Sequence, residues 1–185
     1  MKFPRLAFTF ATIIATAFLT LAFEAQANDG YLAVQGNYGR LDNEDDKKFH
    51  AILGGWIMGG DEEWRAGAGG YKLMSPYSSN VYGNVDLWYA GPMIFWVPNT
   101  ESKEVVIHLG GQIGGGFASN STSSKSNFFY VIEPTIILAF KLSSWSGIGV
   151  SVSYRYITNF STTPSAIDTI SHSFNAGAAL ILGEF

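Results

Sequence analysis

The chain has 185 residues, no cysteine and a formal net charge of −4. The missing cysteine excludes a disulfide scaffold, a thiolate metal site and a cysteine nucleophile, and an acidic chain without a basic stripe argues against a nucleic-acid partner. Aromatic residues make up 15% and charged residues only 14%, with 21 glycines, which is typical of a β-protein that exposes an apolar surface to lipid and uses glycine where strands curve.

Residues 1–27 have the three parts of a secretory signal peptide. Lys2 and Arg5 give a positive start, the stretch from Leu6 to Phe23 is apolar, and Ala25-Gln26-Ala27 is a small-x-small cleavage site. We therefore expect cleavage after Ala27, with an uncleaved membrane anchor as the competing interpretation. No uncharged apolar run of about 18 residues follows, so residues 28–185 are expected to form one domain without a transmembrane helix.

The first three strands are predicted at 31–38, 49–58 and 64–71. Side chains alternate there between apolar and polar or small, and successive side chains of a strand point to opposite faces. Glycines and acidic residues at 59–62 predict a tight hairpin between the second and third strands. A two-residue turn would place Arg65 opposite Trp56, and we expect a cation–π contact between them.

Two further strands are predicted at 84–97 and 104–117, separated by a turn at 98–103. In the first, the residues expected to face outward are Val85, Leu87, Tyr89, Gly91, Met93 and Phe95. Those expected to face inward are Asn84, Asp86, Trp88 and Ala90. In the second, the polar and glycine face consists of Glu104, His108, Gly110, Gln112, Gly114 and Gly116.

The strongest alternation covers 128–141 and 146–156. One face is apolar throughout, with aromatic residues near its ends, and the other is mixed, which suits a strand between lipid and a lumen. The apolar face consists of Phe128, Tyr130, Ile132, Pro134, Ile136, Leu138 and Phe140, continued by Ile148, Val150, Val152, Tyr154 and Tyr156. A three-residue turn at 143–145 would pair Leu142 with Ser146, and this register places Glu133 directly opposite Arg155 on the lumen side.

The closing strand is predicted at 171–185, and its register is open. The positions in step with Phe185 are less apolar than the alternate set, which includes Phe174, Leu180 and Leu182, and a slip of one residue would exchange the two faces. Eight strands result, with longer polar loops at 40–47, 75–82, 119–127 and 161–169 and shorter turns between them. We therefore predict an all-β fold, an eight-stranded antiparallel up-and-down transmembrane barrel at 28–185, with its short turns on the periplasmic side.

From Ala51 to Phe185 the chain resembles the small eight-stranded outer-membrane barrels, of which the transmembrane domain of the outer membrane protein A family is the best known. The signal peptide, the alternating strands and the terminal Glu184-Phe185 carry the resemblance. Several glycine-rich segments look most like a subgroup of these barrels with no assigned activity: Gly54-Gly55-Trp56-Ile57, Gly67-Ala68-Gly69-Gly70-Tyr71 and Ile113-Gly114-Gly115-Gly116.

The resemblance implies where the protein lies and what surrounds it. It implies the outer membrane of a Gram-negative cell, with lipid and lipopolysaccharide around the barrel. It also implies that the barrel-assembly machinery reads the C-terminal strand, which ends in Phe185. We expect a monomer.

The polar residues expected in the lumen are Glu133, Arg155, Arg65, His108, Asp86 and His50. We interpret this lumen cluster as structural first, with Glu133 and Arg155 as a buried ion pair and a ligand contact or polar relay as the alternative. His50, His108 and Asp86 are the types of residue that bind metals or transfer protons, but no two are at ligand spacing within one strand. We therefore expect no catalytic residue, no metal and no cofactor.

The favoured hypothesis for function is a non-enzymatic outer-membrane barrel with a structural or surface-interaction role, its lumen filled by side chains. A lipid-modifying enzyme or small-ligand binder using the polar interior is the alternative. The His-x-Ser pair found in eight-stranded lipid A deacylases is absent, because no serine follows two residues after His50, His108 or His172. A third hypothesis is a soluble, lipocalin-like exported barrel, which would point its apolar faces inward.

Overall fold

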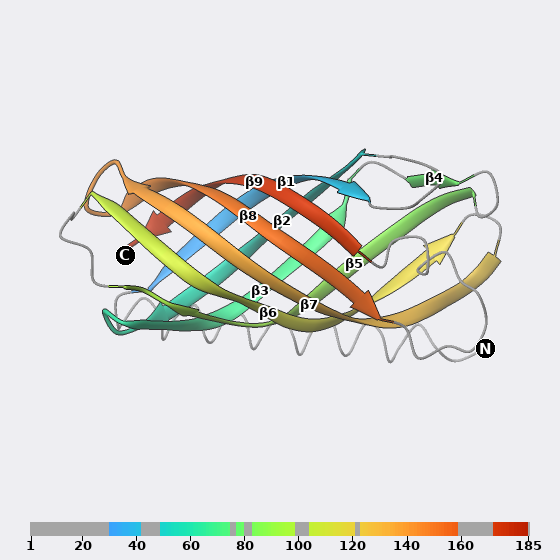
Figure 1. The fold of residues 1–185 in the computed structure, drawn as a ribbon, viewed down its shortest axis with the longest axis horizontal. Helices are drawn as coiled ribbons and strands as arrows, with labels where there is room; N and C mark the ends of the chain where they lie inside the picture. The colour runs from blue at the N-terminus through green and yellow to red at the C-terminus, as the bar shows by residue number, and fades with distance from the viewer. Residues whose placement is uncertain are drawn as a thin grey trace.

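The computed structural model describes residues 30–41, 49–74, 77–79, 83–98, 104–120, 123–158 and 172–184. In these ranges the chain forms one antiparallel sheet that closes into a barrel (Figure 1). Its strands are β1 (Tyr31–Leu41), β2 (Phe49–Gly60), β3 (Trp64–Leu73), β4 (Tyr77–Ser79), β5 (Gly83–Trp96), β6 (Val105–Asn120), β7 (Ser123–Lys141), β8 (Ser146–Thr158) and β9 (His172–Gly183). The predicted signal peptide, residues 1–27, and Phe185 lie outside the described residues.

Each strand pairs with its neighbours in the chain, and two pairings close the barrel. β1 pairs with both β2 and β9, and β3 pairs with β5. The short β4 pairs with β5 beyond the end of β3, so β3 and β4 together occupy one position in the wall. The described residues therefore form the predicted eight-stranded up-and-down barrel. In the same ranges no helix is long and apolar enough to span a membrane.

The alternation read from the sequence determines which side chains point outward on β7 and β8. Large apolar side chains on their outer faces, such as Ile132 and Val150, are 48% and 47% exposed. The alternate residues Val131 and Ile137 are almost fully buried. A strand wall with this pattern presents a nearly continuous apolar exterior. The predicted faces of these two strands are confirmed.

The interior of the barrel is packed with side chains. Its apolar residues include Trp56, Met58, Tyr89, Phe95, Phe129, Ile137 and Ile181, all buried. An eight-stranded barrel is just wide enough for side chains to fill it, and these residues are large. Gly116 shows how tight the packing is, because a Cβ there would lie 2.6 Å from the Cβ of Tyr89 and 2.8 Å from the ring of Phe129.

The predicted faces of the strand at 84–97 are wrong. Leu87, Tyr89 and Phe95 point inward and are at most 2% exposed, whereas Asp86 and Trp88 lie on the outer surface. Both faces of this strand are largely apolar, so hydrophobicity did not distinguish the lumen side from the lipid side, and the few polar residues were a poor guide. The pairing with β3 decides the orientation, because directly paired residues share a face, and Tyr89 is paired with the inward-facing Tyr71.

The predicted loop at 119–127 is mostly strand. β6 continues to Asn120 and β7 begins at Ser123, with Ala118 paired with Asn127 and Ser119 with Ser126, followed by a register shift. The segment has no apolar alternation, so hydrophobic periodicity does not detect it. The backbone pairing of this segment continues that of Phe117 with Phe128, whose side chains are apolar. The predicted loops at 40–47 and 161–169 lie almost entirely outside the described residues, and β4 falls within the predicted loop at 75–82.

The structure resolves the open register of the last strand. Phe174 and Leu180 are 60% and 51% exposed, whereas Ile181 and Ala179 are buried. The outward face is therefore the more apolar alternate set and not the set in step with Phe185. Gly183, at the end of β9, has a φ of +128°, a conformation that favours glycine.

Two turns of the described residues lie at one end of the barrel, together with the end of β9 (Figure 1). They connect β2 to β3 and β7 to β8, and we call this the turn end. The opposite end, where β1 and β8 finish, we call the far end. The β2–β3 turn lies two residues further along the chain than predicted: Gly60 pairs with Arg65, and the Asp61 N–H donates to the Trp64 carbonyl, so Glu62 and Glu63 lie at the tip. The Asp61 carboxylate accepts hydrogen bonds from the backbone N–H groups of Glu63 and Trp64, which lower its pKa.

Candidate functional site

An ion pair between Glu133 on β7 and Arg155 on β8 lies inside the barrel. The Arg155 Nε donates to Oε2 of Glu133 and its Nη2 to Oε1, both at 2.9 Å. The register of β7 and β8 places the two residues opposite one another, as the pairs Ile132–Tyr156 and Thr135–Ser153 on either side show. The predicted pairing is present, and a bidentate geometry of this kind is the strongest form of the carboxylate–guanidinium contact.

Neighbouring side chains complete the surroundings of this pair. The hydroxyl groups of Tyr89 and Ser153 each donate to the Glu133 carboxylate at 2.7 Å. The Arg155 guanidinium lies over the Tyr89 ring at 4.9 Å from its centroid. Glu133 and Arg155 are only 4% and 2% exposed. Both charges are therefore fully enclosed and bound, the condition under which a buried ion pair is tolerated.

A second hydrogen-bond network is centred on Gln35 of β1. Its Oε1 accepts from Trp56 Nε1 at 2.7 Å and from the Tyr71 hydroxyl at 3.3 Å, and its Nε2 donates to Asn37 Oδ1 and Ser151 Oγ at 2.7 Å. The Tyr71 ring stacks on Tyr89 at 5.3 Å and so connects this network to the ion pair. Gln35 and Asn37 are two residues apart in the alternating segment 31–38 and so share a face, but the sequence pattern did not identify Gln35 as a network centre.

His50 lies inside the barrel toward the far end. Its Nε2 is 3.0 Å from Asn175 Oδ1, and Asn175 Nδ2 donates to the backbone carbonyl and side chain of Ser173 at 3.3 Å. All three residues are buried, and His50 Nδ1 has no hydrogen-bond partner among the described residues. Gly39 leaves the room for this contact, because a Cβ there would collide with Asn175 and His50.

His108 lies inside the barrel toward the turn end. Its Nε2 is 2.6 Å from the Tyr31 hydroxyl, and its ring meets Phe95 edge to face. Arg65 lies over the Tyr31 ring at 5.7 Å, so the predicted contact between Arg65 and Trp56 is wrong. The shifted β2–β3 turn pairs Arg65 with Gly60 and Trp56 with Gly69, so Arg65 is not opposite Trp56, and the Trp56 and Tyr31 rings meet edge to face instead.

Asp86 is not in the lumen. It lies on the outer surface, 3.8 Å from Lys72 Nζ, with both side chains more than half exposed. His50 and His108 are separated by most of the length of β1, since they contact the neighbourhood of Gly39 and Tyr31 respectively. The predicted lumen cluster is thus three separate groups and one outside residue. Within the described ranges, no three His, Cys, Asp or Glu side chains form a group able to hold a metal ion.

The lumen groups are therefore placed to hold strands together. Glu133 and Arg155 join β7 to β8, and the Tyr89 hydroxyl adds β5. Gln35 joins β1 to β2, β3 and β8. Each network bridges strands on different sides of the barrel, and its polar atoms are occupied by one another.

Comparisons with solved structures show the same fold in other proteins. Neisserial surface protein A has a TM-score of 0.66 and 13% identity, covering 85% of this chain and 98% of that one. Ail, the attachment invasion locus protein of Yersinia pestis, has a TM-score of 0.53 and 13% identity, covering 85% and 99%. A complex of Ail with the heparin analogue sucrose octasulfate has a TM-score of 0.51 and 13% identity, covering 84% and 97%.

The shared fold is that of the small eight-stranded outer-membrane barrels. No protein-family model matches the chain, and no curated protein matches it in sequence.

Proposed function

We propose that the protein is an integral outer-membrane barrel with a structural or surface-interaction role and without enzymatic activity. The observation that carries the proposal is the combination of an apolar exterior with a filled, internally hydrogen-bonded interior. The proposal includes export through the predicted signal peptide at 1–27 and a barrel that works as a monomer.

The apolar exterior supports a lipid environment over a soluble, lipocalin-like barrel. A soluble barrel would need a polar outer surface, but the exposed faces of β1, β7 and β8 consist mainly of large apolar and aromatic side chains. Aromatic side chains gather toward both ends, with Trp64, Trp96 and Trp145 at the turn end and Trp88, Tyr154 and Tyr156 toward the far end. Aromatic girdles of this kind are typical of membrane interfaces.

The packed interior supports a barrel that is not an open pore. Arg155, Tyr89 and Phe129 are at most 2% exposed, and their large side chains fill part of the lumen. The same packing argues against the alternative of an enzyme or small-ligand binder, because the charged groups of Glu133 and Arg155 are bound to each other and enclosed by Tyr89 and Ser153. Inserted in planar bilayers, the protein is expected to show no steady conductance.

A surface-interaction role is the finer part of the proposal. With short turns toward the periplasm, as in bacterial barrels of this type, the far end faces the outside of the cell. Ail has the same fold and is an attachment invasion locus protein, so attachment is one role this architecture can support. We also propose that the barrel-assembly machinery reads the strand ending in Phe185, and that lipopolysaccharide surrounds the outer half of the barrel.

Two experiments test the proposal. The detergent-extracted protein should migrate faster on unboiled than on boiled gels, because a folded barrel resists denaturation, and it should sediment with outer membranes. Recovery in the soluble periplasmic fraction would contradict the membrane assignment. A deletion strain should be compared for adhesion, permeability and lipid A composition; altered lipid A acylation would instead favour a lipid-modifying enzyme.

A further inference from the structure

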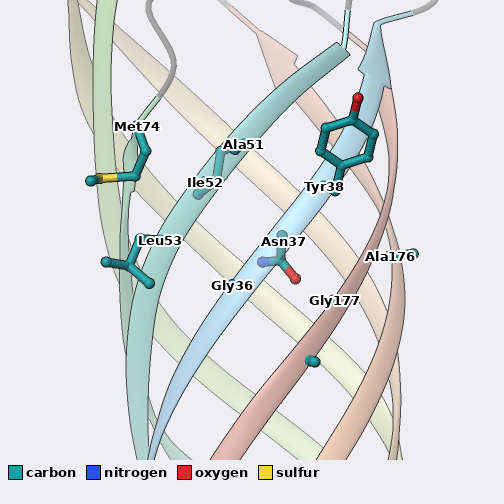
Figure 2. A pocket seen from close by; sticks show the side chains of 10 residues that line it. Gly36, Asn37, Tyr38, Ala51, Ile52, Leu53, Met74, Ala176 and Gly177 are labelled. Carbon is teal, nitrogen blue, oxygen red and sulfur yellow. The ribbon is translucent and has the colours of Figure 1, made fainter.

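A hollow of about 570 Å³ lies on the outer wall of the barrel, over β1 and between β9 and β2 (Figure 2). Its outward-facing lining consists of Gly36, Tyr38, Ala51, Leu53, Met74, Ala176 and Ala178. Gly36 on β1 is directly paired with Ala178 on β9, and Ala176 on β9 is directly paired with Tyr38 on β1. Small side chains on β1 and β9 thus form the floor, and Leu53 and Met74 form one wall.

The glycine in the floor has no function in the packing of the chain itself. A Cβ at Gly36 would meet no atom within 4 Å, and its φ lies outside the left-handed range. Gly177 on the adjacent strand is different, because a Cβ there would collide with Asn37 and crowd Ser151. Glycine in a strand interior loses backbone entropy on folding and contributes no side-chain packing. The open space at Gly36 is therefore available to something outside the chain.

We propose that this hollow holds a fatty-acyl chain of a bilayer lipid, kept there longer than the lipids around the rest of the barrel. This inference rests on the proposed membrane location. The hollow is continuous with the apolar exterior, since Val34 and Leu180 beside it are 53% and 51% exposed. Its outward-facing side chains offer methyl and methylene groups, the surface that an acyl chain matches.

Tyr38 sets the direction of the bound chain. Its hydroxyl points toward the end of β1 at Leu41, away from the hollow (Figure 2). A tyrosine in this position places its hydroxyl at the headgroup level and its ring in the hydrocarbon region. The lipid headgroup would then lie near the Tyr38 hydroxyl, and the chain would pass Gly36 and Ala178 toward the middle of the membrane.

A second copy of this protein fits the hollow less well than a lipid. A two-fold contact through this face would place the same surface on both partners. Hollow would then meet hollow, and the floor at Gly36 would remain empty. A flexible acyl chain fills a shallow, open groove without this constraint.

The test introduces larger side chains into the floor of the hollow and measures how tightly the protein binds lipid. The variants Gly36→Leu and Ala178→Leu add side chains to the hollow from two different strands, so one can replace the other if it fails to fold. The control is Gly70→Leu, at an outward-facing glycine of β3 where a Cβ would meet the Ala90 Cβ at 3.6 Å, an ordinary contact. Folding of each variant is confirmed by its heat-modifiable migration.

The probe is a phospholipid with two saturated acyl chains, titrated into the delipidated protein and followed by native mass spectrometry. We expect one lipid to bind the unaltered protein and Gly70→Leu equally, and to bind Gly36→Leu and Ala178→Leu about tenfold more weakly, as expected from losing roughly 55 Å² of apolar contact. Equal affinity in all four proteins would overturn the inference. A dimer of the unaltered protein that Gly36→Leu abolishes would also overturn it, in favour of self-association.

The two proposals fail in different ways. If the unaltered protein is not heat-modifiable and does not sediment with membranes, the membrane assignment is wrong. If it is membrane-embedded but binds lipid no more tightly than Gly36→Leu, only the lipid site is wrong.

Discussion

Replacing Glu133 by alanine is the sharpest test of the barrel interior. The substitution removes the acceptor of two hydrogen bonds from Arg155 and of one each from the hydroxyls of Tyr89 and Ser153. Arg155 is 2% exposed among the packed side chains of the lumen, so its charge cannot reach water without disrupting that packing. The variant therefore contains a buried, unneutralised guanidinium.

The expected loss of unfolding free energy follows from this burial. Breaking a buried ion pair by removing one partner costs roughly 3–5 kcal/mol, because the remaining charge stays in a low-dielectric environment. The cation–π contact of Arg155 with Tyr89 is present in both proteins and therefore does not change this difference. We therefore expect Glu133→Ala to lower the folding equilibrium constant by more than about a hundredfold.

The assay is reversible urea unfolding in lipid vesicles, followed by tryptophan fluorescence and by gel mobility. Lys72→Ala is the matched control, because the Lys72–Asp86 pair is long and more than half exposed, and such pairs contribute at most about 1 kcal/mol. The exchange Glu133→Arg with Arg155→Glu restores opposite charges at adjacent positions. It should recover a large part of the stability that Glu133→Ala loses.

Two results would refute the reasoning. One is an unfolding free energy of Glu133→Ala within about 1 kcal/mol of that of Lys72→Ala. The other is a double-mutant cycle for Glu133 and Arg155 in which the two alanine substitutions are additive, since residues in direct contact should be coupled.

Other parts of the interior lead to further predictions. Tyr31→Phe removes the hydroxyl 2.6 Å from His108 Nε2 and should cost about 1–3 kcal/mol. Tyr156→Phe on the exposed face keeps the ring contact with His172 and should change the unfolding midpoint little, so equal effects of the two substitutions would contradict the placement of Tyr31. Gln35→Leu leaves the Trp56 Nε1 without its acceptor and should lower the free energy of unfolding by about 1–3 kcal/mol in the same assay. A variant more stable than the unaltered protein would show that the network is dispensable. Glu133→Ala should also raise ion conductance in planar bilayers, because the ion pair contributes to filling the lumen. A variant that conducts no more than the unaltered protein would show that other side chains block the lumen.

The sequence was most informative where a strand has one fully apolar face. The faces of the segments 128–141 and 146–156 are as predicted, because every second residue there is large and apolar. The Glu133–Arg155 pairing followed from the turn at 143–145, since Leu142 N–H and Ser146 carbonyl do form the expected hydrogen bond. A short turn fixes the register of a hairpin, and the register fixes which side chains meet.

The sequence was least informative where both faces are apolar or both are polar. The strand at 84–97 carries Leu87, Tyr89 and Phe95 on one face and Trp88, Ile94 and Trp96 on the other, so hydrophobicity cannot separate a packed lumen from a lipid-facing wall. The polar end of the β6–β7 hairpin, Ser119 to Ser126, shows no period at all. Its strand character comes from backbone hydrogen bonds that continue the ladder.

By itself the sequence determined the class of fold and the apolar exterior, because both depend on a local period of two. Only the tertiary structure decided what the interior residues contact. Tyr89 reaches Glu133 because the pairing of β5 with β3 points its side chain into the lumen, and Asp86 lies outside. Arg65 reaches Tyr31 because the β2–β3 turn is centred on 62–63 and not on 60–61. Contacts across a lumen join residues far apart in the chain, and their positions depend on every register around the barrel, which no local pattern specifies.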